Sequence, residues 1–471
     1  MSSGATEGEA REPQDHHGGG RLRGSSFVPR STAYSGRFGR MFRPLSPLAS
    51  SDADLAKLAG AMCDTAAGPD GDNPGHPAGY TFLGQFVDHD ITFDPVSSLE
   101  RVNDPDALNS FRTPRFDLDS LYGSGRSDSP FLYDQEDPAK LLVGQNPATI
   151  HEPVDLPRNH QGRALIGDPR NDVHVILSQM HLVFIRFHNA AVDHLRSRFF
   201  PDPELFDEAR RLTLWHYQGV VVDDFLRRRV GPEILDSVIR RNPSTGQLRT
   251  SLRFYRWKRQ PYIPVEFSAA AYRFGHSQVR PAYRLNDTLE PIPILTDIRV
   301  PHPLQHLGGF RPLPKRWTIQ WDLFFDLGAA APQLSRKVDT RISKPMCALP
   351  VTVDRDRRSL ALLNLLRGRS LSLPSGQAVA AAMGTSLPDD DLGLAGATPL
   401  WHYVLREAEV LEDGHRLGPT GGRIVAEVLV GLLQGDRSSF LSVAPGWKPE
   451  LPAAEPGTFT MPDLRRFAGV A

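Results

Sequence analysis

The sequence contains only two cysteines, Cys63 and Cys347, in 471 residues. Their positions show no spacing typical of a metal site or a disulfide framework, so we expect a protein held together without cross-links. An excess of charge is also lacking, because 54 basic residues balance 55 acidic ones. This balance predicts neither nucleic acid nor an anionic membrane surface as a partner. No apolar run approaches the ~18 residues that span a bilayer, so no membrane span is expected.

The first forty residues are rich in Gly, Ser, Arg and His, and they lack the apolar core of a signal peptide. We therefore expect residues 1–40 to be a disordered leader and residues 41–471 to form one folded domain. A cytoplasmic location follows from the same absence, with export by another route left open. The 41 prolines favour many short helices joined by rigid loops, and strand signals are sparse.

One motif places His89 between two carboxylates, Asp88 and Asp90, in an otherwise apolar neighbourhood. Buried carboxylates without partners are costly, so each of the two needs a cation, a strong donor or a covalent partner. If residues 81–91 are helical, Gln85, Asp88 and His89 share one face, and Asp90 lies roughly 100° further round. One face could then line a pocket while the other holds a metal ion.

Four more polar segments follow, at residues 113–123, 167–172, 272–277 and 364–376. The first alternates oxygen-bearing residues, which can supply the six to eight oxygens that calcium takes; solvated acidic residues in an Asx-type turn are the alternative. The second begins with Asp168 and Pro169, a typical helix start with Asp168 as the cap of the apolar run from Val175 to Phe187. Helix signals explain the Asp and the Pro but leave Arg170 unexplained.

Together these five motifs resemble the animal-type haem peroxidases of the peroxidase-cyclooxygenase superfamily, in their shorter bacterial form. The resemblance runs from Gly84 to Gln377 and implies a mostly α-helical fold, with many helices around a buried haem and few short strands. It implies haem b and calcium as cofactors. The implied activity is reduction of hydrogen peroxide through a ferryl intermediate, followed by oxidation of a halide, a phenol or another small donor.

On the distal side of the haem, the resemblance implies His89 as the base that moves the peroxide proton and Arg170 as the distal arginine. Gln85 is implied as the amide that orders a water or halide. Asp88 matches the residue that forms a haem ester in the relatives, although the sequence leaves open whether the bond forms. A second ester is excluded, because Val173 stands where those relatives carry a Glu.

On the proximal side, the resemblance implies His276 as the iron ligand and Asn364 as the acceptor of a hydrogen bond from it. Arg367 matches an arginine that pairs with a haem propionate, and Arg273 is placed with the haem-binding residues. The fatty-acid dioxygenase branch carries a radical-forming Tyr at the position of Arg273. Here the Tyr is displaced to Tyr272, which favours a peroxidase.

The resemblance also implies one calcium site that joins the distal helix to the loop after it. Asp90 comes from the helix, and Thr113, Arg115, Asp117 and Asp119 come from the loop, with Arg115 offering its carbonyl oxygen. An ion held by all five residues would clamp the helix that carries the distal base.

Two alternatives stay open at this point: a fatty-acid dioxygenase of the same superfamily, and a catalytically silent adhesion module that binds calcium or haem. His181 and His188 are expected to be packed or hydrogen-bonded structural histidines, because the resemblance gives them no contact with iron. The expected partners are hydrogen peroxide and a small-molecule donor, whose identity the motifs do not set.

Overall fold

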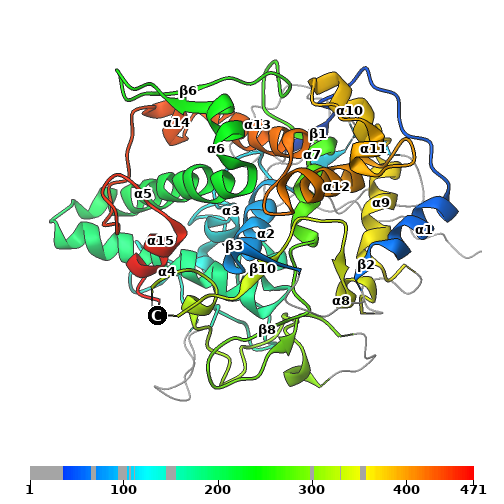
Figure 1. The fold of residues 1–471 in the computed structure, drawn as a ribbon. Helices are drawn as coiled ribbons and strands as arrows, with labels where there is room; N and C mark the ends of the chain where they lie inside the picture. The colour runs from blue at the N-terminus through cyan, green and yellow to red at the C-terminus, as the bar shows by residue number, and fades with distance from the viewer. Residues whose placement is uncertain are drawn as a thin grey trace, which may run out of the picture.

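The computed structural model describes residues 36–64, 71–93, 103–105, 108–110, 112–144, 155–296, 302–328, 330–350 and 357–470 (Figure 1). In these segments the chain is mostly helical with short strands, which confirms the predicted fold class. The α-helices are α1 (Asp52–Ala61), α2 (Gly79–Ile91), α3 (Asp119–Tyr122), α4 (Val175–Ser197), α5 (Leu205–Gly219), α6 (Arg227–Val238), α7 (Val265–Ser268), α8 (Lys344–Cys347), α9 (Leu360–Ser370), α10 (Gly376–Met383), α11 (Asp389–Leu392), α12 (Leu400–Glu412), α13 (Pro419–Gly435), α14 (Phe440–Val443) and α15 (Met461–Phe467). The strands are β1 (Gly36–Gly39), β2 (Cys63–Asp64), β3 (Asp72–Pro77), β4 (Asn109–Ser110), β5 (Ile239–Arg241), β6 (Leu248–Thr250), β7 (Ile263–Pro264), β8 (Ala282–Tyr283), β9 (Ile292–Pro293), β10 (Leu334–Arg336) and β11 (Ile342–Ser343).

The strands of the described segments form one three-stranded sheet, in the order β4, β1, β7, and four pairs. Strand β1 pairs antiparallel with β4 and parallel with β7, and Phe38 in it is buried. The predicted leader therefore ends too late at residue 40, because β1 already belongs to the folded domain. Its partners lie far along the chain, so no local pattern marks it. Residues 1–35 lie outside the described residues, and the leader stays a prediction for them.

Helix α2 lies near the centre of the molecule (Figure 1), where it contacts α4 and the 3-10 segment η7 (Ala271–His276). The prediction of a helix over residues 81–91 is confirmed, with a start two residues earlier at Gly79. A side chain at Gly79 would clash, because its Cβ would lie 2.4 Å from the ring of Phe325. Glycine thus lets the first turn of α2 pack directly against the chain at Phe325.

Helix α4 packs along α2, and the rings of Phe184 and Phe86 stack in parallel with centroids 4.5 Å apart. The cap of α4 differs from the prediction: His174 accepts the N–H of Leu177, whereas Asp168 caps a short 3-10 turn, η4 (Pro169–Asp172). The reason is that residues 173 and 174 separate η4 from α4, so each of the two helices has a cap of its own. By length and composition α4 could cross a membrane, but 83% of its apolar window is buried within the structure, as in a core helix.

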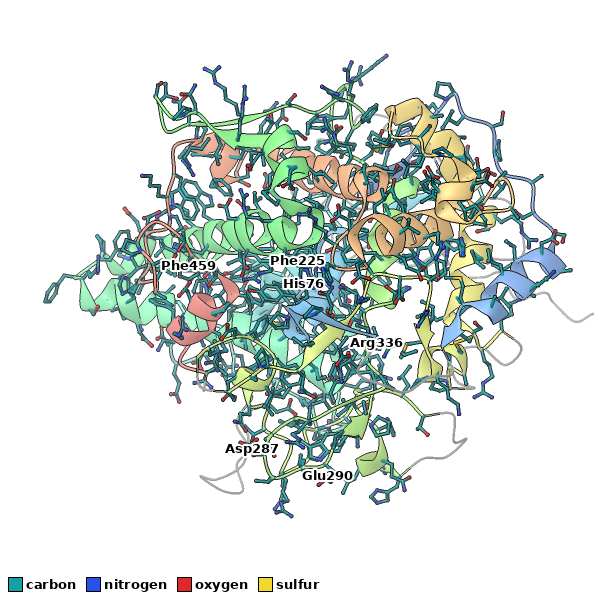
Figure 2. All side chains as sticks on the ribbon, in the orientation of Figure 1. His76, Phe225, Asp287, Glu290, Arg336 and Phe459 are labelled. Carbon is teal, nitrogen blue, oxygen red and sulfur yellow. A yellow bond between two sulfur atoms is a disulfide. The ribbon has the colours of Figure 1, made fainter. Side chains whose placement is uncertain are left out.

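Aromatic side chains fill the core around α2. Figure 2 places Phe225 and His76 in the interior and Asp287 and Glu290 at the periphery. Phe225 belongs to a π-helical turn, η6 (Val220–Leu226), which joins α5 to α6. A Cβ at Gly84 would lie 3.1 Å from the Phe225 ring, so the absence of a side chain at residue 84 lets α2 and η6 approach closely.

Cys63 and Cys347 form a disulfide, with their Cα atoms 6.0 Å apart. The expectation of a protein without cross-links is therefore wrong. Strand β2, which begins at Cys63, pairs in parallel with β11, and β11 leads directly into α8, which ends at Cys347. Spacing along the chain could not reveal this bond, because the two cysteines are 284 residues apart and are brought together by a parallel strand pair.

His216, in α5, fastens the C-terminal part of the chain to the helical core. Its Nδ1 donates to the carbonyl oxygen of Leu212 at 2.7 Å, and its Nε2 accepts the backbone N–H groups of Glu450 and Leu451 at 3.0 and 3.1 Å. Both nitrogens are thus committed in the neutral form. Burial lowers the pKa of His216 to about 4.

This arrangement predicts a loss of stability in acid. At neutral pH His216 is uncharged in both the folded and the unfolded state. Below the ordinary pKa of about 6.5, His216 of the unfolded chain binds a proton, whereas His216 of the folded chain stays unprotonated until the pH nears its lowered pKa. Replacing His216 by Gln should therefore reduce the slope of unfolding free energy against pH by about 1.4 kcal/mol per pH unit near pH 5. Urea unfolding from about pH 7 to 5 measures this slope. The control His160→Gln, at an exposed position, should keep the wild-type slope; an unchanged slope in His216→Gln would contradict the assignment.

Candidate active site

Helix α2 is buried on all sides except the one that carries the predicted pocket residues. Gly84, Gln85 and Asp88 are half-buried and His89 is 9% exposed, while Phe86 and the other apolar residues of the helix are almost fully buried. The prediction that Gln85, Asp88 and His89 share one face is confirmed. Gly84, Gln85 and Asp88 on that face, the open face of α2, are the residues of the helix that keep partial exposure.

The imidazole of His89 is held from behind by Asn171. Nδ1 of His89 lies 2.8 Å from Oδ1 of Asn171, and Nε2 has no hydrogen-bond partner among the described residues. Burial, and the charge of Arg170, lower the pKa of His89 to about 4. The ring is therefore uncharged at neutral pH, as a proton acceptor needs to be.

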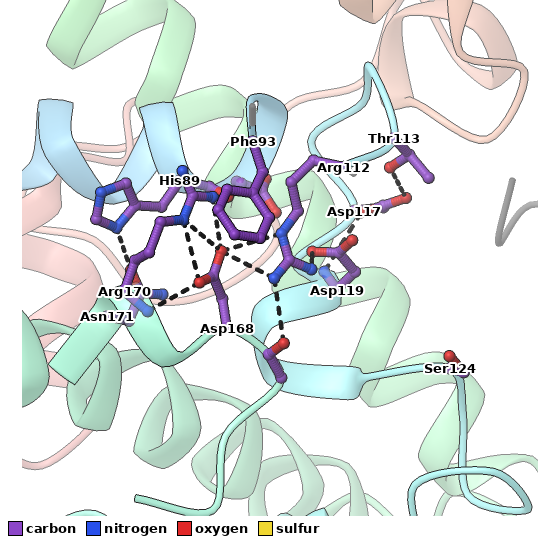
Figure 3. A network of polar contacts seen from close by, with 12 residues as sticks. His89, Phe93, Arg112, Thr113, Asp117, Asp119, Ser124, Asp168, Arg170 and Asn171 are labelled. Carbon is purple, nitrogen blue, oxygen red and sulfur yellow. Dashed lines mark hydrogen bonds and ion pairs between the residues drawn. The ribbon is translucent and has the colours of Figure 1, made fainter. Parts of the chain in front are cut away.

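The guanidinium of Arg170 lies beside His89 but is already paired (Figure 3). Nε and Nη2 donate to the carboxylate of Asp168, and Nη2 also donates to the carbonyl oxygen of His89 at 2.9 Å. Its face stacks over the ring of Phe93 at 4.3 Å. Only Nη1 has no hydrogen-bond partner among the residues described. Arg170 can thus donate hydrogen bonds to a ligand through Nη1, and its positive charge is partly offset by the carboxylate of Asp168.

Asp168 and Arg112 extend this network to the predicted calcium loop (Figure 3). Arg112 donates to Asp168 through Nε at 3.0 Å and forms an ion pair with Asp119 at 2.9 Å. Burial raises the pKa of Asp168, but hydrogen bonds from Arg170 and the charge of Arg112 outweigh it and lower the pKa to about 2. One buried carboxylate thereby ties the distal arginine to the acidic loop.

The side chain of Gln85 is oriented by His174. Since Nδ1 of His174 accepts the N–H of Leu177, its Nε2 carries the proton and donates to Oε1 of Gln85 at 2.8 Å. Burial, and the nearby His89, lower the pKa of His174 to about 3, so this neutral form persists. The amide oxygen of Gln85 is thus engaged, and its NH₂ group remains to face the accessible side of α2.

The carboxylates of Asp90, Asp117 and Asp119 converge, with one oxygen of each within 4.8 Å of the others. Asp90 is fully buried: Tyr217 donates to its Oδ2 at 3.1 Å, while its Oδ1 has no hydrogen-bond partner in the described part of the chain. Burial and mutual repulsion raise the pKa of Asp90 well above its ordinary range, and burial, with the charge of Asp119, raises that of Asp117 to about 7. A cation would relieve both effects, so the donor set fits calcium.

The two other predicted calcium ligands lie in the same loop. Thr113 is buried and its hydroxyl donates to Asp117 at 2.7 Å. Arg115 turns its side chain toward Asp436, 4.0 Å away, and its backbone stays in the turn, where its N–H donates to the carbonyl of Thr113. The structure thus brings the loop and the distal helix together at the carboxylates.

On the opposite segment, η7, His276 is bonded to the residue that the sequence pairs with it. Nδ1 of His276 lies 2.7 Å from Nδ2 of Asn364, which projects from α9. Burial, and the charge of Arg273, lower the pKa of His276 to about 3. Nε2 of His276 has no hydrogen-bond partner among the described residues, and the ring is half-buried.

The orientation of the Asn364 amide differs from the expectation that it accepts a hydrogen bond from His276. Arg273, which can only donate, holds Oδ1 of Asn364 at 2.7 Å and also donates to the carbonyl of Ser268. The amide nitrogen is therefore left facing His276. The opposite orientation, with Oδ1 toward Nδ1, is the one that leaves Nε2 free of a proton for a metal.

The remaining predicted residues lie on the same segments. Oδ1 of Asp88 accepts a hydrogen bond from Thr92 at 3.0 Å, and the side chain keeps partial exposure on the open face of α2. Arg367 follows Asn364 by one helical turn of α9 and is half-buried. A Cβ at Gly275 would meet no atom within 4 Å, so open space adjoins His276. The open space fits a flat cofactor beside His276, and binding of iron at Nε2 requires the Asn364 amide to turn its oxygen toward Nδ1.

Sequence reasoning missed four residues that position the site: Arg112, Asn171, His174 and Tyr217. Asn171 directly follows Arg170 and His174 comes four residues after it, so their nearness in sequence was the available signal. Arg112 and Tyr217 had no local signal. His181 and His188 were correctly predicted as hydrogen-bonded: Asn171 lies 3.0 Å from Nδ1 of His181, and His188 contacts Tyr122 and the carbonyl of Ala139.

Comparison with known proteins identifies the class. The family model described as animal haem peroxidase matches residues 105–390, more than half of the chain. The chain belongs to the animal haem peroxidase family. The family implies haem as the cofactor.

Among named relatives, heme peroxidase 2 of Caenorhabditis elegans is 26% identical over 353 residues, covering 70% of this chain and 48% of the relative. Human thyroid peroxidase is 26% identical over 266 residues, covering 54% of this chain and 25% of the relative. The chain thus spans less than half the length of these curated relatives.

Two solved structures share the fold. Peroxidase A of Dictyostelium discoideum superposes with a TM-score of 0.61 at 14% identity, over 87% of this chain and 89% of the other. A fatty acid alpha-dioxygenase of Oryza sativa gives a TM-score of 0.58 at 16% identity, over 85% and 77%. At such identities the likeness shows the fold alone.

Proposed function

We propose that this chain is a haem peroxidase, which reduces hydrogen peroxide and oxidises a small donor such as a halide or a phenol. The observation that carries the proposal is the open face of α2. That face presents an uncharged His89 and the oriented Gln85, with Arg170 beside them. In η7, which contacts α2, Nε2 of His276 has no hydrogen-bond partner among the described residues.

In this proposal the haem binds at His276, with the Asn364 amide turned so that its oxygen accepts the Nδ1–H of the imidazole, and Arg367 pairs with a propionate. The bound haem supplies the redox chemistry that no side chain can supply. His89 accepts the proton of the inner peroxide oxygen at Nε2 and returns it to the outer oxygen. Arg170 donates through Nη1 to the charge that develops there, and Gln85 orders a water or halide through its NH₂ group.

The first test removes the proposed iron ligand. In His276→Ala the side chain that would bind iron is gone, so the protein should lose the Soret absorbance of the haem-loaded wild type. Absorbance spectra after loading with haem measure this. His302→Ala, at an exposed histidine, serves as the control and should keep the spectrum. Normal Soret absorbance and peroxide turnover in His276→Ala would show that another residue binds the iron.

We further propose that the haem has at most one covalent tether, an ester from Asp88. The carboxylate is half-buried on the open face, whereas Asp172, near the missing second tether at Val173, is held by both Nη groups of Arg158.

Extraction with acidified acetone tests this tether. At least part of the haem should be released, because one ester per haem is the most that the chain can form and that bond depends on prior turnover. The absorbance of the organic phase measures the released fraction. Complete retention by Asp88→Asn would point to an unforeseen anchor.

A calcium ion is proposed at Asp90, Thr113, Arg115, Asp117 and Asp119. It would neutralise the buried carboxylates and give the unpartnered Oδ1 of Asp90 a ligand. The ion would also fix α2 to the loop that begins with Arg112.

Calcium should therefore raise the stability of the protein. At roughly 100 times its Kd, a ligand specific for the folded state stabilises by about 2.7 kcal/mol. Thermal unfolding with calcium and with a chelator measures the shift. Asp117→Asn should abolish it, and Asp390→Asn, in the exposed acidic turn of α11, should preserve it. An equal shift in both variants would place the ion elsewhere.

The fold likeness to a fatty acid alpha-dioxygenase keeps that alternative open to test by oxygen uptake with unsaturated lipid. The dioxygenase branch carries its radical-forming Tyr at the position of Arg273, whereas here the tyrosine is the preceding residue, Tyr272. The hydroxyl of Tyr272 donates to the carbonyl of Gly84 at 3.1 Å. The other alternative, a catalytically silent adhesion module, would bind calcium or haem but would not turn over peroxide. Location stays a prediction, and the Cys63–Cys347 bond speaks against a reducing cytoplasm.

A further inference from the structure

Asn171 lies between two buried imidazoles and bonds to both. Its Oδ1 is 2.8 Å from Nδ1 of His89, and its Nδ2 is 3.0 Å from Nδ1 of His181 in α4. Asn171 and His181 are completely buried, and Nε2 of His181 has no hydrogen-bond partner among the residues that the structure describes. The amide therefore acts on both rings at once.

The chemistry of the three groups allows two arrangements. An amide oxygen only accepts a hydrogen bond and an amide nitrogen only donates one. The Nδ1 atom that faces the oxygen must therefore donate, and the Nδ1 atom that faces the nitrogen must accept. With the oxygen toward His89, Nδ1 of His89 carries the proton and Nε2 is left as a lone pair. If the amide turned over, Nε2 of His89 would carry the proton and could accept none.

We propose that Asn171 is a positioning residue that selects the Nδ1–H form of His89, while its amide nitrogen donates to His181. The inference rests on the proposed peroxidase function, because it assigns Nε2 as the atom that accepts the peroxide proton. Asn171 itself exchanges no proton. His181 contributes only by accepting the Nδ2–H of the amide at its own Nδ1.

A purely structural role for Asn171 makes a different prediction. Asn189, in α4, holds a loop in place: its side chain accepts the N–H of Leu141 at 2.8 Å and donates to the carbonyl of Leu141 at 2.9 Å. If Asn171 did no more than this, its loss would lower stability and leave the reactivity of the distal pocket unchanged. Asn189→Leu is therefore the matched control.

Hydrogen cyanide probes the base without catalysis, since it must give up its proton as the anion binds ferric haem. In Asn171→Leu the rate of cyanide binding to the haem-loaded protein should fall ~100-fold, at the lower end of what a positioned base contributes. Asn171→Asp keeps an oxygen toward His89 and should stay within about threefold of the wild type. Asn189→Leu should bind cyanide at the wild-type rate. A wild-type rate in Asn171→Leu would overturn the proposal.

Neutron diffraction from deuterated crystals of the haem-loaded wild type gives a second, independent reading. Deuterium on Nδ1 of His89 and on the Asn171 nitrogen that faces His181 is the expected result. Deuterium on Nε2 of His89 instead would overturn the inference even if the variants failed to fold. A wild type that ignores peroxide would overturn the proposed function, while the neutron map would still decide the form of His89.

Discussion

The structure depends on how the central helix α2 accommodates three polar residues in a row. His89 and Asp90 are both buried, and neither is tolerated there without partners. Because successive residues point in directions about 100° apart, His89 meets Asn171 while Asp90 meets the acidic loop. One helix thereby carries a pocket on one side and a cation site on another.

These two sites are joined by a continuous series of charged contacts. Asp119 pairs with Arg112, Arg112 and Arg170 share Asp168, and Arg170 donates to the carbonyl of His89. In a medium of low dielectric constant each link is costly to break, because a buried charge would lose its partner. The network explains how the acidic loop can fix the distal arginine without contacting the pocket.

Much of this was accessible from the sequence, where chemistry and local periodicity coincide. Periodicity placed Gln85, Asp88 and His89 on one face if residues 81–91 were helical, and the family resemblance implied the pairing of His276 with Asn364 and the meeting of Asp90 with Asp117 and Asp119. What the sequence could not supply were orientations that depend on distant donors. Arg273 decides which atom of Asn364 faces His276, and Asp168 takes up most of the Arg170 guanidinium. Strand β1 and the disulfide were missed because their partners lie far away in the chain.

A crystal structure of the protein loaded with haem tests the central claim most directly. The account predicts one porphyrin between the open face of α2 and η7, with Nε2 of His276 on the iron and Nε2 of His89 facing the opposite side. Haem bound elsewhere, or the two imidazoles on unrelated surfaces of the molecule, would contradict it.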